Sequence, residues 1–153
     1  MASLLDPIQI GEITLPNRVI MCPLTRLRGT TDHLPTPLMI EYYTQRATAG
    51  LILSEGIPVV PQGVGYANVP GIWSQQQTDA WKPVTESVHR VGGRIFAQIW
   101  HVGRISDPRF LDGLLPVAPS AIRPAGHVSL VRPITDYVTP RALQISEIPG
   151  VVE

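Results

Sequence analysis

Apolar residues along the chain form short runs and helically spaced sets in alternation. Apolar runs at 19–24, 51–54 and 94–104 are typical of buried strands, each of which ends in a loop. Apolar residues at helical spacing follow the first two runs, at 37–50 and 74–92. The order strand, helix, strand, helix, strand predicts parallel βαβ units with right-handed crossovers.

Both predicted helices carry residues that commonly begin or end a helix. Thr36 followed by Pro37 predicts the start of the first helix, and Gly50 predicts its end. Ser74 and Gln77 resemble a capping box, in which each residue satisfies a backbone N–H of the other. We therefore expect the second helix to begin directly after Ser74.

The segments outside these units carry weaker patterns. Alternating apolar and polar residues at 8–15, around Gly11, predict a short N-terminal hairpin. The proline-rich stretch 104–139 has no sustained period and predicts a long excursion loop or hairpin. Ser146, with Pro149 shortly after it, predicts the start of a third helix.

Composition limits the class of protein and of partner. With 153 residues, 44% of them hydrophobic, the chain is long enough for one globular domain with a sizeable core. Twelve basic and twelve acidic residues balance without any basic run, so neither nucleic acid nor a membrane is expected as a partner. No signal peptide or membrane-spanning stretch is recognisable, so we expect a cytoplasmic protein that acts on a small molecule. The single Cys22 is expected to be a small buried side chain, and no metal site is predicted.

The third apolar run contains Gln98, the most informative polar residue of the chain. A polar group inside a core strand must be hydrogen-bonded, so a long amide there is either a ligand contact or a core amide satisfied by backbone. Because α/β proteins bind ligands at the carboxyl ends of their strands, Gln98 is a candidate binding residue. His101, at the end of the same run, is expected to be structural.

Several motifs, in one order along the chain, carry a family resemblance. They are 21–26 (MCPLTR), 35–50 (PTPLMIEYYTQRATAG), 65–67 (GYA), 70–71 (PG), 93–104 (GRIFAQIWHVGR) and 139–143 (TPRAL). Together they resemble the Old Yellow Enzyme family of FMN-dependent ene-reductases. That family folds as an eight-stranded (β/α)8 TIM barrel, and this chain resembles its first three βα units with their N-terminal hairpin. The resemblance implies that 1–153 is the N-terminal part of a single FMN-binding barrel domain, ending at the start of the third helix.

The resemblance also implies which residues contact the flavin. Pro23, Leu24 and Thr25 would lie against the isoalloxazine, and the Thr25 hydroxyl would donate to a flavin carbonyl near the redox centre. Gln98 would bond the pyrimidine edge, because a carboxamide presents donors and an acceptor in one plane. Gly56 stands where the family usually has alanine, so its backbone could still approach the ring.

Two aromatic residues, Tyr66 and Trp100, would line the substrate pocket according to the same resemblance. On the residues alone, Thr25 fits an ordinary capping or turn residue equally well. Arg104 and Arg141 would lie at the rim or act as structural ion-pair partners, and the structural interpretation is slightly favoured.

The implied reaction is a ping-pong hydride transfer from NADPH or NADH through FMN to an activated alkene such as an enone, maleimide or nitro-alkene. The histidine or asparagine pair, the tyrosine proton donor and the phosphate site of the family are not found before Glu153. We therefore expect the chain to be inactive alone and to need a complementary chain that carries the remaining barrel strands. The alternative is a non-catalytic half-barrel that pairs with itself as a binding or assembly module.

Overall fold

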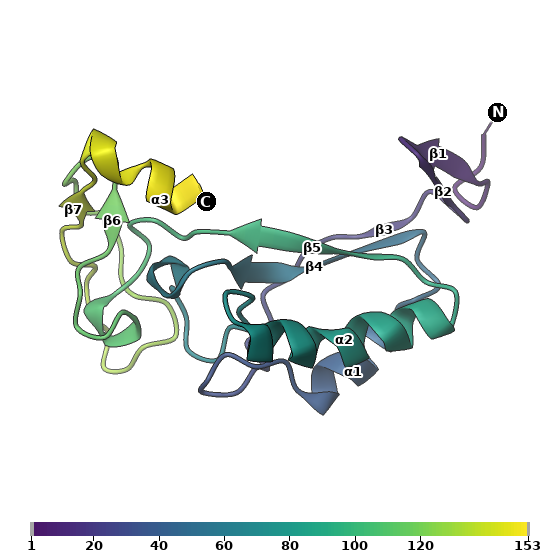
Figure 1. The fold of residues 1–153 in the computed structure, drawn as a ribbon, viewed down its shortest axis with the longest axis horizontal. Helices are drawn as coiled ribbons and strands as arrows, with labels where there is room; N and C mark the ends of the chain where they lie inside the picture. Colours follow the sequence, from purple (N-terminus) through teal and green to yellow (C-terminus); the bar gives the residue numbers. More distant parts are fainter. Residues whose placement is uncertain (1, 153) are drawn as a thin grey trace. The chain divides into compact units, whose positions relative to one another are not determined.

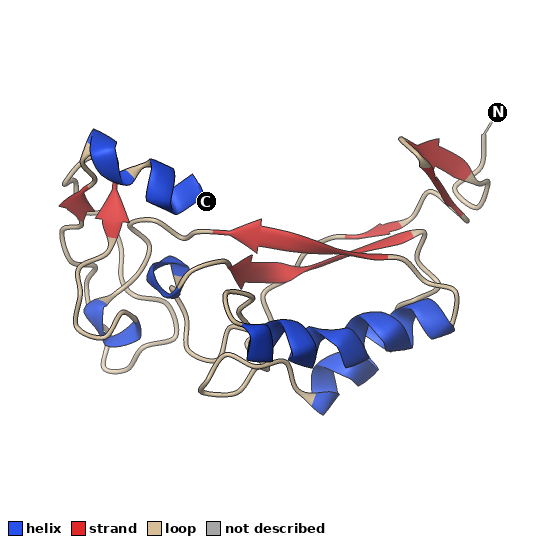
Figure 2. Ribbon diagram, in the orientation of Figure 1, coloured by secondary structure: helices blue, strands red, loops and turns tan. Residues whose placement is uncertain are grey.

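The computed structural model describes residues 2–152, which form two compact units (Figures 1 and 2). The first unit comprises the residues up to Val59 together with Asn68–Trp100. The second unit comprises Val60–Ala67 and the residues from His101 onward. Each unit has buried apolar residues of its own.

A three-stranded parallel sheet forms the centre of the first unit. Its strands are β3 (Ile20–Met21), β4 (Leu51–Pro58) and β5 (Ile95–Trp100), with β4 in the middle. This arrangement confirms the predicted parallel units. β3 is shorter than the predicted run 19–24, because Pro23 has no N–H to donate to a ladder. β4 is longer than predicted and continues through two polar residues, Ser54 and Glu55.

Helices α1 (Pro37–Thr44) and α2 (Gln75–Arg90) lie together on one side of this sheet (Figure 1). Their apolar faces and the sheet form the main core, whose largest members are Met39, Tyr43, Ile52, Ile57, Trp81, Val84 and Val88. The prediction that α1 ends at Gly50 is wrong, since the helix ends at Thr44. Gly50 has a different role: a Cβ at this position would collide with the backbone of Asn17, so only glycine permits their close approach.

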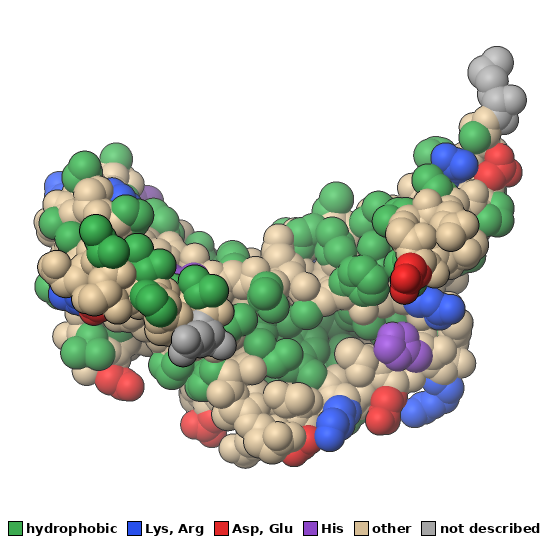
Figure 3. All heavy atoms as spheres, turned by 45° about the horizontal axis from the view of Figure 1, so that its top comes forward, with side chains coloured by type: hydrophobic (Ala, Val, Ile, Leu, Met, Phe, Trp, Pro, Cys, Tyr) green, Lys and Arg blue, Asp and Glu red, His purple; other side chains and the backbone are tan. Residues whose placement is uncertain are grey.

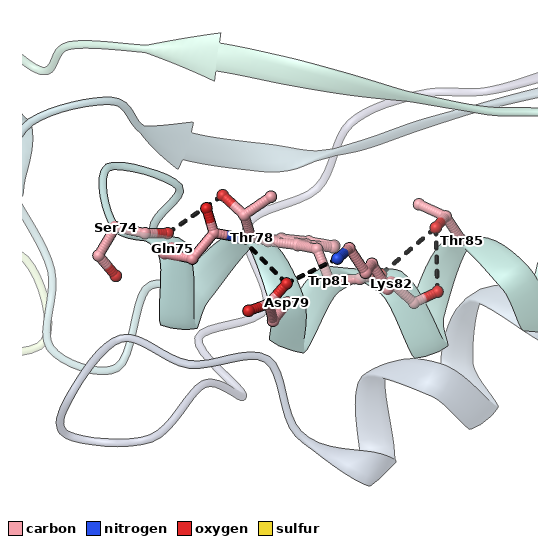
Figure 4. Close-up of polar contacts among 7 residues, drawn as sticks. All are labelled: Ser74, Gln75, Thr78, Asp79, Trp81, Lys82 and Thr85. Carbon is pink, nitrogen blue, oxygen red and sulfur yellow. Dashed lines mark hydrogen bonds and ion pairs between the residues drawn. The ribbon is translucent and has the colours of Figure 1, made fainter.

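The predicted capping box at the start of α2 is present. The Ser74 hydroxyl accepts a bond from the Gln77 N–H at 3.2 Å, and the Gln77 side chain accepts from the Ser74 N–H at 3.2 Å. Figure 4 shows the exposed polar side chains of the next turns, where Asp79 accepts bonds from Gln75 and from Lys82. The first turns of α2 are therefore held by local polar contacts.

The remaining elements are short. In the first unit, β1 (Ile8–Ile10) and β2 (Ile13–Leu15) form the predicted antiparallel hairpin. In the second unit, β6 (Val117–Ala118) pairs in parallel with β7 (Arg141–Ala142). The third predicted helix begins as the 3-10 turn Ile145–Glu147 and continues as α3 (Pro149–Val152), with two further 3-10 turns at Pro61–Gly63 and Pro108–Phe110. Among the helices of residues 2–152, none has the length and apolar character needed to cross a bilayer.

The sheet leaves apolar side chains uncovered (Figure 3). Phe96 and Ile99 of β5 are 49% and 66% exposed, and Leu24 after β3 is 56% exposed. The prediction that the third run is a buried strand is thus wrong for the described residues, where β5 has a partner strand on one side only. Cys22 is also exposed, contrary to the expectation of a buried thiol, because it follows the short strand at the other edge of the sheet.

Candidate active site at the ends of the parallel strands

Three of the predicted site residues lie at the carboxyl end of the sheet in the first unit. Gly56 of β4 is directly opposite Gln98 of β5 in the strand register. Thr25 follows β3, and the next residue, Arg26, donates its backbone N–H to the side chain of Glu55 on β4. The structure therefore brings Thr25, Gly56 and Gln98 to the same end of the sheet, where parallel α/β proteins bind ligands.

An irregularity in β4 sets the position of Gln98. Leu53 pairs with Phe96, and the next pair joins Gly56 to Gln98, so β4 contains one extra residue at this point. The buried Ser54 hydroxyl accepts a bond from the Gln98 N–H at 3.0 Å and donates to the Glu55 carbonyl at 2.8 Å. A side chain thus replaces the backbone acceptor that the bulge removes from the ladder.

Two polar side chains at this end of the sheet are available to a ligand. The Gln98 side chain is exposed, and within residues 2–152 its carboxamide has no hydrogen-bond partner. The interpretation of Gln98 as a core amide satisfied by backbone therefore does not fit. The Thr25 side chain is half-buried and its hydroxyl likewise lacks a partner in the described part of the chain, unlike that of a capping residue.

A buried carboxylate, Glu55, lies beside these residues and was not predicted to have a role. Glu55 is 1% exposed. Its Oε2 accepts from the backbone N–H groups of Arg26 and Leu27 at 3.1 and 3.2 Å, and its Oε1 accepts from the Tyr43 hydroxyl at 3.3 Å. Burial raises the pKa of Glu55, and the two backbone N–H bonds oppose that rise. A charged residue within an apolar run was the signal in the sequence that could have identified it.

The ring of Trp100 lies against the backbone of Gly56. A Cβ added to Gly56 would collide with the six-membered part of the Trp100 indole. In this chain the glycine therefore leaves space that the aromatic side chain fills. Tyr66 is half-buried, and burial raises the pKa of its hydroxyl. Tyr66 belongs to the second unit, so its pairing with Trp100 as a pocket wall stays a prediction.

The other polar candidates have structural partners. His101 accepts a bond at Nδ1 from the Gly103 N–H at 3.0 Å, and burial lowers its pKa. The Arg104 guanidinium donates to the Ile122 carbonyl at 2.9 Å. Arg141 forms an ion pair with Glu147 at 2.7 Å. These contacts agree with the structural interpretation of all three residues.

A family model described as NADH:flavin oxidoreductase / NADH oxidase matches residues 3–152. The chain belongs to this family. The flavin oxidoreductase hxnT of Emericella nidulans is 42% identical to it, over 97% of this chain and 39% of that protein. The 12-oxophytodienoate reductase 7 of Oryza sativa subsp. japonica is 41% identical, over 99% of this chain and 40% of that protein.

Solved structures agree with this assignment. The old yellow enzyme homologue from Zymomonas mobilis matches with a TM-score of 0.94 and 48% identity, over 99% of this chain and 42% of that one. Morphinone reductase in complex with tetrahydroNAD matches with a TM-score of 0.92 and 48% identity, over 99% of this chain and 44% of that one. The chain thus spans about two fifths of the length of these relatives. The resemblance to the Old Yellow Enzyme family and the prediction of a partial barrel are confirmed.

Proposed function

We propose that this chain forms part of an FMN-dependent oxidoreductase that uses NADPH or NADH to reduce activated C=C bonds. The observation that carries the proposal is the pair of polar side chains, Thr25 and Gln98, which lack partners in the described chain and lie at the same end of the sheet. The family match and the likeness to a morphinone reductase that binds tetrahydroNAD support a flavin and a nicotinamide reductant.

Each candidate residue has a role that its chemistry fits. Gln98 would bind the flavin pyrimidine edge through donors and an acceptor that lie in one plane. The Thr25 hydroxyl would donate to a flavin carbonyl, while Pro23 and Leu24 supply apolar surface. Gly56 would contribute through its backbone, since the Trp100 ring occupies the space next to its Cα. FMN held by these residues would supply the hydride-transfer chemistry between the nicotinamide and the alkene. Tyr66 and Trp100 would supply aromatic surface for a flat unsaturated substrate such as an enone, maleimide or nitro-alkene.

We also propose that a complementary chain carrying further barrel strands covers the sheet. Phe96 and Ile99 on β5 expose large apolar side chains beside the unpaired edge of that strand. Edges and apolar faces of this kind are covered in parallel α/β proteins. The complementary chain would also supply the proton donor and the phosphate site, so that the chain described here is inactive alone.

The test is to purify the protein with anything that copurifies and to record its visible flavin absorbance. We expect anaerobic NADPH or NADH to bleach the flavin and cyclohexenone or N-ethylmaleimide to restore it. Thr25→Val should lower the flavin midpoint potential and slow the bleaching, because the reduced ring loses a hydrogen bond to its developing charge. Thr14→Val, in the exposed hairpin strand β2, is the matched control. A protein without flavin, or a flavin that neither nicotinamide reduces, would contradict the proposal.

A further inference from the structure

The hydrogen bonds of Glu55 join three elements of the first unit. Its carboxylate bonds the backbone of the segment after β3, at Arg26 and Leu27, and the side chain of Tyr43 on α1. The Tyr43 hydroxyl in turn accepts a bond from the Glu55 N–H at 2.9 Å. Tyr43 is itself fully buried, so the carboxylate is held in one orientation from the side of the helix.

The segment that Glu55 binds is not in a relaxed conformation. Leu27 has a φ of 56°, in the left-handed region that residues with a Cβ rarely adopt. A residue keeps such a conformation only where its surroundings enforce it, and these positions cluster at functional sites. The bond from the Leu27 N–H to the Glu55 carboxylate is the contact that acts directly on this residue.

Although the Arg26 guanidinium lies over the Tyr42 ring at 4.8 Å, side-chain packing around this segment is incomplete. A cavity of about 200 Å³ lies next to it, lined by Arg26, Arg28, Tyr42 and Glu55 among others. Close packing is what normally holds a loop in one position, and here it is interrupted. The Glu55 carboxyl oxygens accept from two backbone N–H groups and from the Tyr43 hydroxyl, which is the pattern that an ionised carboxylate satisfies. Hydrogen bonds to an ionised acceptor are stronger than those to a neutral one, so the two backbone bonds are suited to hold the segment beside the cavity.

We propose that Glu55 is a positioning residue that holds the segment Pro23–Thr25 in the position in which it would contact the flavin. The inference rests on the proposed function, because it concerns the same site. Arg26 follows Thr25 directly, so fixing the Arg26 N–H limits where the Thr25 backbone and hydroxyl can lie. Glu55 itself points to the loop backbone and α1, and it is not proposed to touch flavin or substrate.

The first test is amide hydrogen exchange on the purified flavin-bound protein, for Glu55→Gln against the matched control Glu86→Gln. Gln keeps the size of the side chain and removes its charge, whereas Glu86 is exposed on α2. We expect exchange at Arg26 and Leu27 to rise about tenfold in Glu55→Gln and to stay unchanged in the control. Tyr43→Phe should produce a smaller rise at the same two amides, which gives a second variant should Glu55→Gln fold poorly.

The second test measures the flavin midpoint potential. Glu55→Gln should lower the potential in the same direction as Thr25→Val, and it should add little when Thr25 is already valine, because it acts through that hydroxyl. If wild-type protein holds a reducible flavin, two results would overturn the inference. One is unchanged amide exchange at Arg26 and Leu27, and the other is an equal potential shift from Glu55→Gln with and without Thr25→Val. A wild-type protein without flavin would instead overturn the proposed function and with it the proposed role of Glu55.

Discussion

Replacing Gly56 by alanine tests the packing of the site most directly, since a Cβ at this position would meet the Trp100 ring. The added Cβ would collide with the Trp100 ring, and no other residue is among its nearest neighbours. Gly56 is not among the residues with positive φ, so its backbone can accommodate alanine. The closest steric conflict of the substitution is therefore with one side chain, that of Trp100.

The expected magnitude follows from two opposing effects. Forcing extra volume into a packed position costs about 1–3 kcal/mol. Alanine at a compatible backbone position recovers about 0.4–1 kcal/mol, because the unfolded chain has less freedom to lose. Trp100 is only half-buried on an edge strand, so its ring can move, and the steric cost lies at the lower end of the range of about 1–3 kcal/mol. We expect Gly56→Ala to lower the free energy of unfolding by about 1 kcal/mol.

Urea unfolding followed by far-ultraviolet circular dichroism measures this loss, and a double-mutant cycle with Trp100→Ala assigns its cause. With the indole removed, Gly56→Ala should cost nothing, which gives a coupling energy above the usual additivity error of about 0.5 kcal/mol. Gly150→Ala is the control, because a Cβ there would meet no atom within 4 Å. An equal cost of Gly56→Ala in both backgrounds would refute the proposed collision.

Three further outcomes are expected from the same unfolding measurements. Ser74→Ala removes the cap of α2 and should cost about 1 kcal/mol; an unchanged urea midpoint would contradict the importance of the capping box. Ser54→Ala leaves the Gln98 N–H without its acceptor and should cost about 1–3 kcal/mol, with Ser146→Ala as the comparison, because Ser146 is exposed and its hydroxyl has no hydrogen-bond partner within residues 2–152. Burial raises the pKa of Glu55, so the folded state holds that proton more tightly than the unfolded chain. Its contribution to stability is complete below the ordinary pKa of 4.5 and is lost as the pH rises through the raised pKa. Wild type should therefore lose stability relative to Glu55→Gln across this window, and parallel pH curves would contradict this reasoning.

Local signals in the sequence predicted much of the fold. The capping box at Ser74 and Gln77 needs only residues three apart, and the parallel order follows from the alternation of apolar runs with helical spacing. The end of α1 could not be predicted in this way. Gly50 is required by the approach of Asn17, a contact between residues far apart in the sequence, and not by the helix.

The candidate site likewise combines features that local sequence signals predict with features that depend on contacts between distant residues. Thr25 and Gln98 could be proposed as flavin contacts because motifs mark them, and that assignment stays a prediction. The length of β4 could not be inferred from its apolar residues. Polar residues normally end a buried strand, yet Ser54 and Glu55 continue β4 because their partners come from β5, α1 and the segment after β3. These partners exist only in the folded chain.

The bulge in β4 positions backbone groups on both sides of the candidate site. Ser54 bonds the backbone of Gln98 on β5, and its neighbour Glu55 bonds the backbone next to Thr25 after β3. Consecutive strand residues point to opposite faces, and a bulge lets two neighbours reach partners that a regular strand would not allow. A shift of β4 by one residue would exchange these side chains and displace Thr25 and Gln98 together. The relative position of the two proposed flavin contacts is therefore determined by two adjacent residues of the middle strand.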